Sequence, residues 1–128
     1  MSKTSVNARF TMIQAFASFM DSGSQSATIV FYEGVQPADT SVAADSNNAL
    51  VTLVFPEPCI KETTATYVEL HPTDTGTVIK AGTATWARIF NGAGEVAADL
   101  TVGTDISLAN TNLALGGTLS ATSIKLRP

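Results

Sequence analysis

Short runs of β-branched and aromatic residues, separated by turn-forming residues, are the feature that most constrains the fold of this chain. In its second half, runs and turns follow one another at about ten-residue intervals, a spacing typical of antiparallel sandwiches and barrels. The clearest run is 83–90, where Trp86 and Arg88 fall on one face of an alternating strand. The group 91–94, Asn-Gly-Ala-Gly, accepts positive φ at little cost. It therefore predicts a hairpin that returns as a strand over 95–100.

The remaining strand signals are shorter and lie on both sides of this hairpin. Two prolines in Pro56-Glu57-Pro58 remove ladder donors directly after an apolar run, which predicts a sheet edge or a corner between sheets there. Small and mostly polar residues over Thr40–Asn48 indicate a surface loop. The other expected strands are Ala27–Tyr32, Leu50–Phe55, Ala65–Leu70, Ile106–Leu108 with a continuation at Leu113–Leu115, and Thr118–Leu126.

The N-terminal segment has a helical rather than a strand period. Apolar residues recur at intervals of three and four from Val6 to Met20, and Gly23 suits the left-handed position that ends a helix. Such a stripe covers the sheet of its own domain more often than it meets a neighbouring subunit. We therefore expect a mainly β, antiparallel β-sandwich of six to eight strands with one N-terminal α-helix. It forms a single domain over residues 1–128, with the helix at 6–21 and the sandwich at 27–128.

Composition excludes several classes of function. Charged residues make up 14% of the 128 residues, well below the roughly 25% of soluble domains, and the formal net charge is −4. The seven Lys and Arg residues are scattered from Lys3 to Arg127, whereas a nucleic-acid binder needs clustered cations. We find neither a secretory signal nor an apolar run of the roughly 20 residues that a membrane span needs. We expect no nucleic acid, no membrane and synthesis in a cytoplasm.

One pair of residues could in principle catalyse a reaction. Cys59 is the single cysteine and His71 the single histidine, and together they could act as nucleophile and base. No activating cluster surrounds either residue, so a buried apolar thiol and a loop histidine are the better interpretation. Trp86 in mid-strand indicates a core residue rather than a sugar platform, a role left open for Tyr67.

The acidic residues give no clearer signal. Asp99, Asp105 and Glu95 are close enough in sequence to suggest calcium, but Asp commonly caps its own backbone in turns, and we favour that interpretation. Neither Glu57 with Glu62 nor Glu33 with Asp39 forms a pair whose separation indicates glycosidase chemistry. The segment Gly92-Ala93-Gly94 lacks the Gly-Lys-Ser/Thr ending of a phosphate loop. The sequence therefore predicts no enzyme, no cofactor and no catalytic, cofactor-binding or metal-ligating residue.

A resemblance covers most of the chain, least clearly at Thr40–Gly76. In its N-terminal part the chain resembles a family of small proteins encoded in tailed-phage and prophage structural gene clusters through a helix ending in Asp21-Ser22-Gly23, then Ile29-Val30-Phe31-Tyr32, Gly34 and Pro37-Ala38. In its C-terminal part it does so through Gly82-Thr83-Ala84-Thr85-Trp86-Ala87-Arg88-Ile89-Phe90, Gly92, Gly94, Val96, Asp99, Val102-Gly103-Thr104, Gly116-Gly117 and Pro128. In size and β content the chain is also similar to the cement proteins that decorate phage capsids, some of which have jelly-roll folds.

The resemblance implies a non-enzymatic virion structural protein with a jelly-roll-like sandwich. The expected role is a capsid cement, or decoration, protein that stabilises the shell by bridging subunits of the major capsid protein. Its place would be the capsid exterior, after assembly in the host cytoplasm, and it would self-associate as a dimer through the helix or an edge strand. The alternative is a tail- or fibre-associated module that binds a host surface.

Overall fold

The computed structural model of the chain describes residues 14–16, 18–20, 23, 25–56, 60–63, 68–103, 106, 111–119 and 124–126. Within these ranges the protein is mainly β, and eleven short strands pair antiparallel in four sheets. In chain order the strands are β1 (Thr28–Tyr32), β2 (Ala49–Val54), β3 (Ile60–Thr63), β4 (Val68–Leu70), β5 (Gly76–Thr77), β6 (Gly82–Thr83), β7 (Trp86–Phe90), β8 (Val96–Thr101), β9 (Asn112–Leu113), β10 (Thr118–Leu119) and β11 (Ile124–Leu126). The expected mainly β, antiparallel architecture is confirmed, with more and shorter strands than the six to eight expected.

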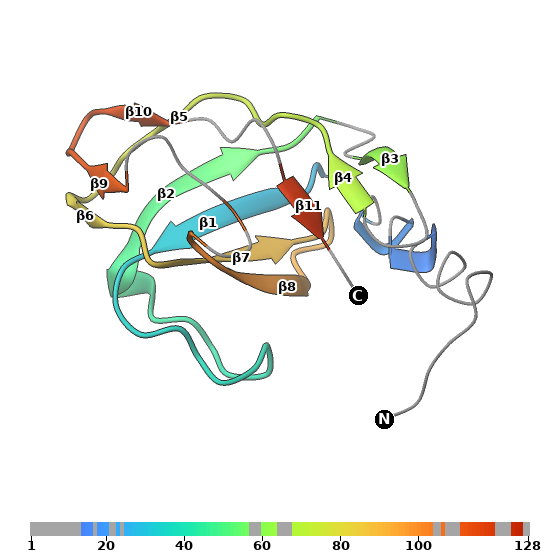
Figure 1. Cartoon of the computed structure of the whole chain (residues 1–128), viewed down its shortest axis with the longest axis horizontal. Helices are drawn as coiled ribbons and strands as arrows, with labels where there is room; N and C mark the ends of the chain where they lie inside the picture. The colour runs from blue at the N-terminus through green and yellow to red at the C-terminus, as the bar shows by residue number, and fades with distance from the viewer. Residues whose placement is uncertain are drawn as a thin grey trace.

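The largest sheet contains four strands in the order β2-β1-β7-β8 (Figure 1). Its strands β7 and β8 form the hairpin predicted from the turn at 91–94. The turn is held by Asn91, which is 2% exposed and whose side-chain oxygen accepts the backbone N–H groups of Ala93 at 3.0 Å and Glu95 at 2.9 Å. Gly94 follows with a φ of +84°, the left-handed conformation for which glycine is suited.

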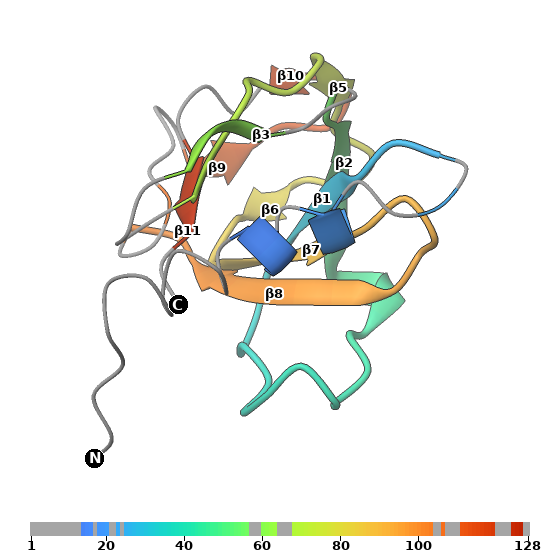
Figure 2. The same cartoon turned by 90° about the vertical axis from the view of Figure 1, so that its right-hand side faces the viewer.

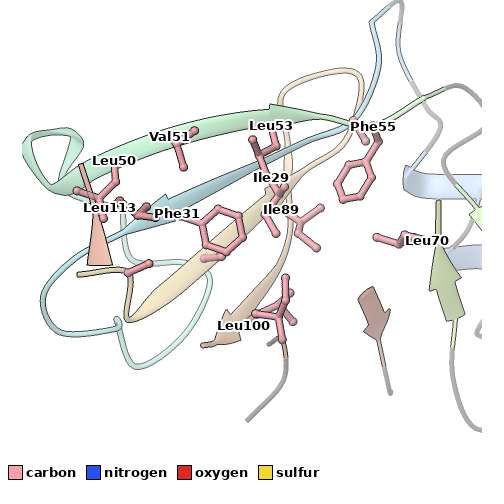
Figure 3. Packing of buried hydrophobic residues seen from close by; sticks show 14 of the residues in the cluster. Ile29, Phe31, Leu50, Val51, Leu53, Phe55, Leu70, Ile89, Leu100 and Leu113 are labelled. Carbon is pink, nitrogen blue, oxygen red and sulfur yellow. The ribbon is translucent and has the colours of Figure 1, made fainter. Parts of the chain in front are cut away.

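One face of this sheet carries the hydrophobic core. Its register places Leu53, Ile29 and Ile89 side by side in one row, and Val51, Phe31, Ala87 and Leu100 in the next. All of these side chains are at most 5% exposed. Leu70 of β4 and Leu113 of β9 meet them from two of the smaller sheets (Figure 3). The smaller sheets therefore cover the core face of the four-stranded sheet.

The smaller sheets contain β11-β4-β3, β10-β5 and β6-β9. They correct two of the expected strands. The run 83–90 is divided between β6, which pairs with β9, and β7, which pairs with β1. The change of partner occurs at Ala84 and Thr85, whose N–H groups bond to Thr111 and Tyr32 respectively. The two described ends of the run 118–126 lie in different sheets, since β10 pairs with β5 and β11 pairs with β4. Strands β3 and β5 were not expected from the sequence.

The N-terminal helix is described at residues 14–16 and 18–20, and the rest of the predicted span 6–21 lies outside the described residues. Met20 is fully buried in the core, and Phe16 packs against the same cluster. Gln14, Ala15 and Ser18 are exposed. The apolar side of the helix therefore covers its own domain, as the period predicted.

The corner expected near Pro56 is present. Strand β2 ends at Val54 in the four-stranded sheet, and β3 begins at Ile60 in another sheet. The outer edge of β2 is itself covered, because Asp74 donates its N–H to the carbonyl of Val54 at 2.9 Å and Ile79 does so to the carbonyl of Leu50 at 2.8 Å. These bonds satisfy edge groups that would otherwise be open to pairing with another chain.

The segment that follows the helix lies directly against the β7–β8 turn. Gln25 donates its N–H to the carbonyl of Gly92 at 3.3 Å, and a Cβ atom placed on Gly23 would stand 2.3 Å from the backbone nitrogen of Ala93. Gly23 also has a φ of +98°. A side chain at position 23 therefore meets both an unfavourable backbone conformation and a backbone that cannot move aside easily.

We expect Gly23→Ala to lower the free energy of unfolding by about 2–4 kcal/mol, measured by chemical denaturation. Gly94→Ala is the matched control, because Gly94 also has positive φ but has no atom within 4 Å of an added Cβ. Gly94→Ala should lower the free energy of unfolding by only about 1 kcal/mol, the cost of placing a side chain on a residue with positive φ. Equal losses in the two variants would contradict a role for the close approach between Gly23 and the turn.

Candidate functional site

The second face of the four-stranded sheet carries a buried cluster of polar and aromatic side chains, formed by Tyr32, Trp86, Arg88 and Asp99. Tyr32 lies opposite Trp86 in the β1–β7 ladder, and Arg88 lies opposite Asp99 in the β7–β8 ladder. The rings of Tyr32 and Trp86 stack with centroids 4.4 Å apart, and the Arg88 guanidinium carbon lies 5.4 Å from the Trp86 ring centroid. We refer to these four residues as the Trp86–Arg88 cluster.

Arg88 and Asp99 form a bidentate ion pair at the centre of the cluster. The guanidinium Nε donates to Asp99 Oδ1 at 2.7 Å, and Nη2 donates to Oδ2 at 3.0 Å. Their side chains are only 3% and 7% exposed. The hydrogen bonds to Asp99 raise the pKa of Arg88 above its ordinary value, so the guanidinium is charged at every physiological pH. The planar fork of arginine matches a carboxylate, which lets both charges be buried.

Burial also changes the acidity of Tyr32. Its side chain is 6% exposed, and removal from water raises the pKa of the phenol above its ordinary value of 10.0. The nearby negative charge of Asp99 acts in the same direction, whereas the positive charge of Arg88 opposes it. The net effect keeps Tyr32 neutral, and in this state its ring serves as an apolar surface for Trp86.

A long loop between β1 and β2 is attached beside this cluster. Thr101 of β8 donates its hydroxyl to the side-chain oxygen of Gln36 at 2.7 Å, and Thr85 donates its hydroxyl to the carbonyl of Gly34 at 2.7 Å. In Figures 1 and 2 the loop extends away from the side of the molecule that carries β5 and β10. We refer to residues 34–47 as the β1–β2 loop.

The base of the β1–β2 loop is closed by backbone and side-chain bonds. Glu33 donates its N–H to the carbonyl of Asn48 at 3.0 Å. Lys80 contacts both sides of the base, with its Nζ 3.0 Å from Glu33 Oε1 and 2.7 Å from the carbonyl oxygen of Asn47. The ends of the loop are therefore fixed beside one another.

Two aspartates give the loop its internal turns. Asp39 accepts the backbone N–H of Ser41 at 2.8 Å and also its hydroxyl, and these bonds lower the pKa of Asp39. Asp45 accepts the backbone N–H of Asn47 at 2.9 Å. Both are Asx turns, in which the carboxylate replaces a backbone acceptor. The loop expected over Thr40–Asn48 is confirmed, ending in the short 3₁₀ helix η1 (Ser46–Asn48).

The residues considered for chemistry do not assemble into one site in the described part of the chain. Cys59, Tyr67, Glu57 and Asp105 lie outside the described residues, so the pairing of Cys59 with His71 stays untested; His71 itself is half-buried directly after β4. Glu62 is exposed on β3, Glu33 contacts Lys80, Asp39 holds a turn, and Glu95 accepts a hydrogen bond from Asn91 at 3.2 Å. Trp86 is buried as predicted, although in the Trp86–Arg88 cluster and outside the main core.

The interpretation of Asp99 as a turn-forming residue was wrong. Asp99 lies within β8 and its carboxylate binds Arg88. The signal that could have revealed it was Arg88 on the Trp86 face of an alternating strand, since a buried guanidinium requires an acceptor. Among the described residues, no three His, Cys, Asp or Glu side chains gather closely enough to hold a metal ion. In the same ranges no helix has the length and apolar character needed to cross a membrane.

Comparisons of this chain with protein-family models, curated proteins and solved structures gave no match.

We expect Arg88→Met to lower the free energy of unfolding by about 3–5 kcal/mol, because it leaves the Asp99 carboxylate buried without a partner. Asp99→Leu should cost a similar amount through the unpaired guanidinium. The double variant Arg88→Met/Asp99→Leu should recover most of this loss, since two apolar side chains replace the pair. Denaturant unfolding of all four proteins measures the coupling, and simply additive losses would contradict it.

Tyr32 should titrate later than an ordinary tyrosine. The phenolate absorbance of the folded protein should include a rise above the ordinary pKa of 10.0, and Tyr32→Phe should remove that rise. Because the folded state holds the Tyr32 proton more tightly than the unfolded chain, the free energy of unfolding should fall as the pH rises above 10.0. If the free energy of unfolding of Tyr32→Phe fell equally steeply with pH, the loss would come from groups other than Tyr32.

Proposed function

We propose that this chain is a non-enzymatic structural protein of a tailed-phage virion, and that it acts as a capsid cement protein bridging subunits of the shell. The observation that carries the proposal is the resemblance of 82–90 and its following glycine turn to small proteins of phage structural gene clusters. In the fold these residues supply β6, the central strand β7 and the hairpin turn. The resembling residues therefore include one of the two inner strands of the main sheet.

The distribution of charge supports a structural role. Arg88 and Asp99 are paired inside the protein, where salt screens them little. Lys80 is paired with Glu33 at the base of the β1–β2 loop, and Lys61 lies 3.6 Å from Glu69 on neighbouring strands. Exposed threonines such as Thr52, Thr77 and Thr83 add neutral hydroxyl surface. Contacts made by such a surface depend on shape and hydrogen bonding, and they tolerate changes in ionic strength.

The same features indicate where the protein would act. A net charge of −4 disfavours contact with packaged DNA and suits the capsid exterior. The partners we propose are the major capsid protein and a second copy of this chain, assembled in the host cytoplasm. A jelly-roll-like sandwich is the finer fold that we propose for the whole chain in this role.

One observation favours the alternative role on a tail or fibre. The β1–β2 loop projects from the sheet, is closed at its base, and exposes Val35 at 93% and Val42 at 47%. Apolar side chains on a structured surface loop are a common way to bind a partner. A host surface protein or glycan bound by this loop is the second candidate function.

Phage particles assembled without this protein should lose genome retention at lower temperature or lower salt than complete particles. Adding purified protein back should restore the shell, and cryo-EM should place it on the capsid surface. Particles of unchanged stability would contradict the cement role. If cryo-EM density for this protein lay on the tail or fibres, and the shell stayed intact without the protein, the tail or fibre role would be the correct one.

A further inference from the structure

The turn between β7 and β8 contains the pair Asn91-Gly92, which is chemically reactive as well as turn-forming. Among the asparagines of the chain, only Asn91 is followed by glycine. Asparagine is one of the labile residues of proteins, because the backbone nitrogen of the next residue can attack its side-chain amide carbon. Glycine leaves that nitrogen unhindered, since it has no Cβ and its backbone rotates freely. Asn91 is therefore the asparagine at which this intramolecular attack meets the least obstruction.

The reaction is a deamidation that needs only water as a second reactant. The nitrogen of Gly92 forms a bond to Cγ of Asn91, and the bond from Cγ to Nδ2 breaks. The amide group leaves as ammonia, taking the proton of the Gly92 N–H, and a five-membered succinimide remains. Water then opens the succinimide at one of its two carbonyl groups, which leaves either aspartate or isoaspartate at position 91.

In the folded protein every polar group of Asn91 has a partner. Its side-chain oxygen accepts the N–H groups of Ala93 and Glu95, and its Nδ2 donates to Glu95 Oε1 at 3.2 Å. Its backbone N–H donates to the carbonyl of Glu95 at 2.9 Å, and its carbonyl accepts the N–H of Gly94 at 3.0 Å. Closing the succinimide ring takes the side chain away from these partners. The hydrogen bonds of the turn therefore oppose the reaction.

The segment after the helix holds the same peptide from outside the hairpin. Gln25 donates its N–H to the carbonyl of Gly92 at 3.3 Å, and a Cβ atom placed on Gly23 would stand 2.4 Å from the carbonyl carbon of Gly92. Asn91 and Gly92 are both buried, although the next three residues of the turn are exposed. The backbone of this pair is therefore free to rotate, and open to water, only when the turn separates from Gly23 and Gln25.

We propose that Asn91 is a site of spontaneous deamidation that the fold keeps unreactive, and that it is modified when the β7–β8 turn opens and separates from Gly23 and Gln25. The products do not return to the same structure. Isoaspartate adds one methylene group to the main chain next to the paired strands β7 and β8. Aspartate places a carboxylate where Nδ2 now donates to Glu95, so that two negative charges face one another. Modification therefore makes the opening irreversible.

The first test compares the full wild-type chain in native buffer and in urea at the same mildly alkaline pH. Peptide mapping by mass spectrometry measures the loss of ammonia and the appearance of aspartate and isoaspartate at position 91. In native buffer the reaction should be at least about 100-fold slower, because it proceeds only from an open state populated to about 1% or less. In urea, Gly92→Ala should slow the reaction to about the rate at Asn47, which is followed by another asparagine.

Gly23→Ala tests the contact between the turn and the segment after the helix. Its added Cβ presses on the turn, so the turn should open more often and deamidation in native buffer should become about tenfold faster. Gly103→Ala is the matched control, because Gly103 also has positive φ, has no atom within 4 Å of an added Cβ and lies beyond the other end of β8. Its rate should stay within about twofold of the wild-type rate. If Gly23→Ala does not fold, the comparison of wild type in buffer and urea still decides.

Refolding from urea measures the consequence for the fold. Wild-type chains that regain the folded state, separated by size exclusion, should retain Asn91, whereas chains that fail to refold should be enriched in isoaspartate at position 91. Equal modification of the two fractions would show that the opening stays reversible after deamidation.

The other outcomes test the remaining parts of the proposal. Equal rates in native buffer and in urea would overturn protection by the fold, and a rate at Asn91 no faster than at Asn47 in urea would overturn the site. Equal acceleration by Gly23→Ala and Gly103→Ala would overturn the role of the contact. None of these outcomes bears on the cement role, which the experiment on phage particles tests separately.

Discussion

The bidentate pair between Arg88 and Asp99 links the inner strand β7 to the edge strand β8 of the four-stranded sheet. It joins β7 to β8 across the face that the hydrophobic core does not occupy, and it places the guanidinium beside Trp86, which stacks on Tyr32 of β1. The four-stranded sheet thus buries apolar side chains on one face and carries a charge pair between two neighbouring strands on the other. Removing either charge leaves its partner in a medium that solvates it poorly.

The local sequence pattern correctly predicted those parts of the fold that depend on residues close together in the sequence. The hairpin at 91–94, the corner after β2 and the buried apolar side of the helix at Met20 were all predicted. The ion pair was not, because it depends on a bulge. From Phe90 opposite Val96 a regular ladder would bring Arg88 opposite Ala98, and one extra residue in β8 brings Asp99 there instead. Strand β5 was not predicted because its position depends on partners far away in the sequence. Gly76 pairs with Leu119, and residues on either side of β5 donate hydrogen bonds to the edge of β2.

The structural use of charge also explains why the acidic residues gave no clear signal of a site in the sequence. Three acidic residues that were considered for chemistry hold structure in the described part of the chain: Glu33 pairs with Lys80 at the base of a loop, Asp39 forms a turn, and Asp99 binds Arg88. A low fraction of charged residues, much of it engaged in this way, leaves a surface dominated by hydroxyl and aliphatic groups.

The closed base of the β1–β2 loop has a consequence for how this protein can diverge. Glu33 is hydrogen-bonded to Asn48, and Lys80 contacts both Glu33 and Asn47. The two ends of the loop therefore stay fixed on the sheet when the tip of the loop changes. Loop-closure entropy grows only logarithmically, and doubling the length of a flexible loop costs about 0.6 kcal/mol. Insertions at the exposed tip of the loop, over 40–43, therefore cost little, whereas changes at Gly34, Asp39 or Asp45 would disturb a positive φ or a turn on which the loop depends. The tip of this loop is therefore the position at which a foreign peptide can be inserted while the sheet keeps its anchor points.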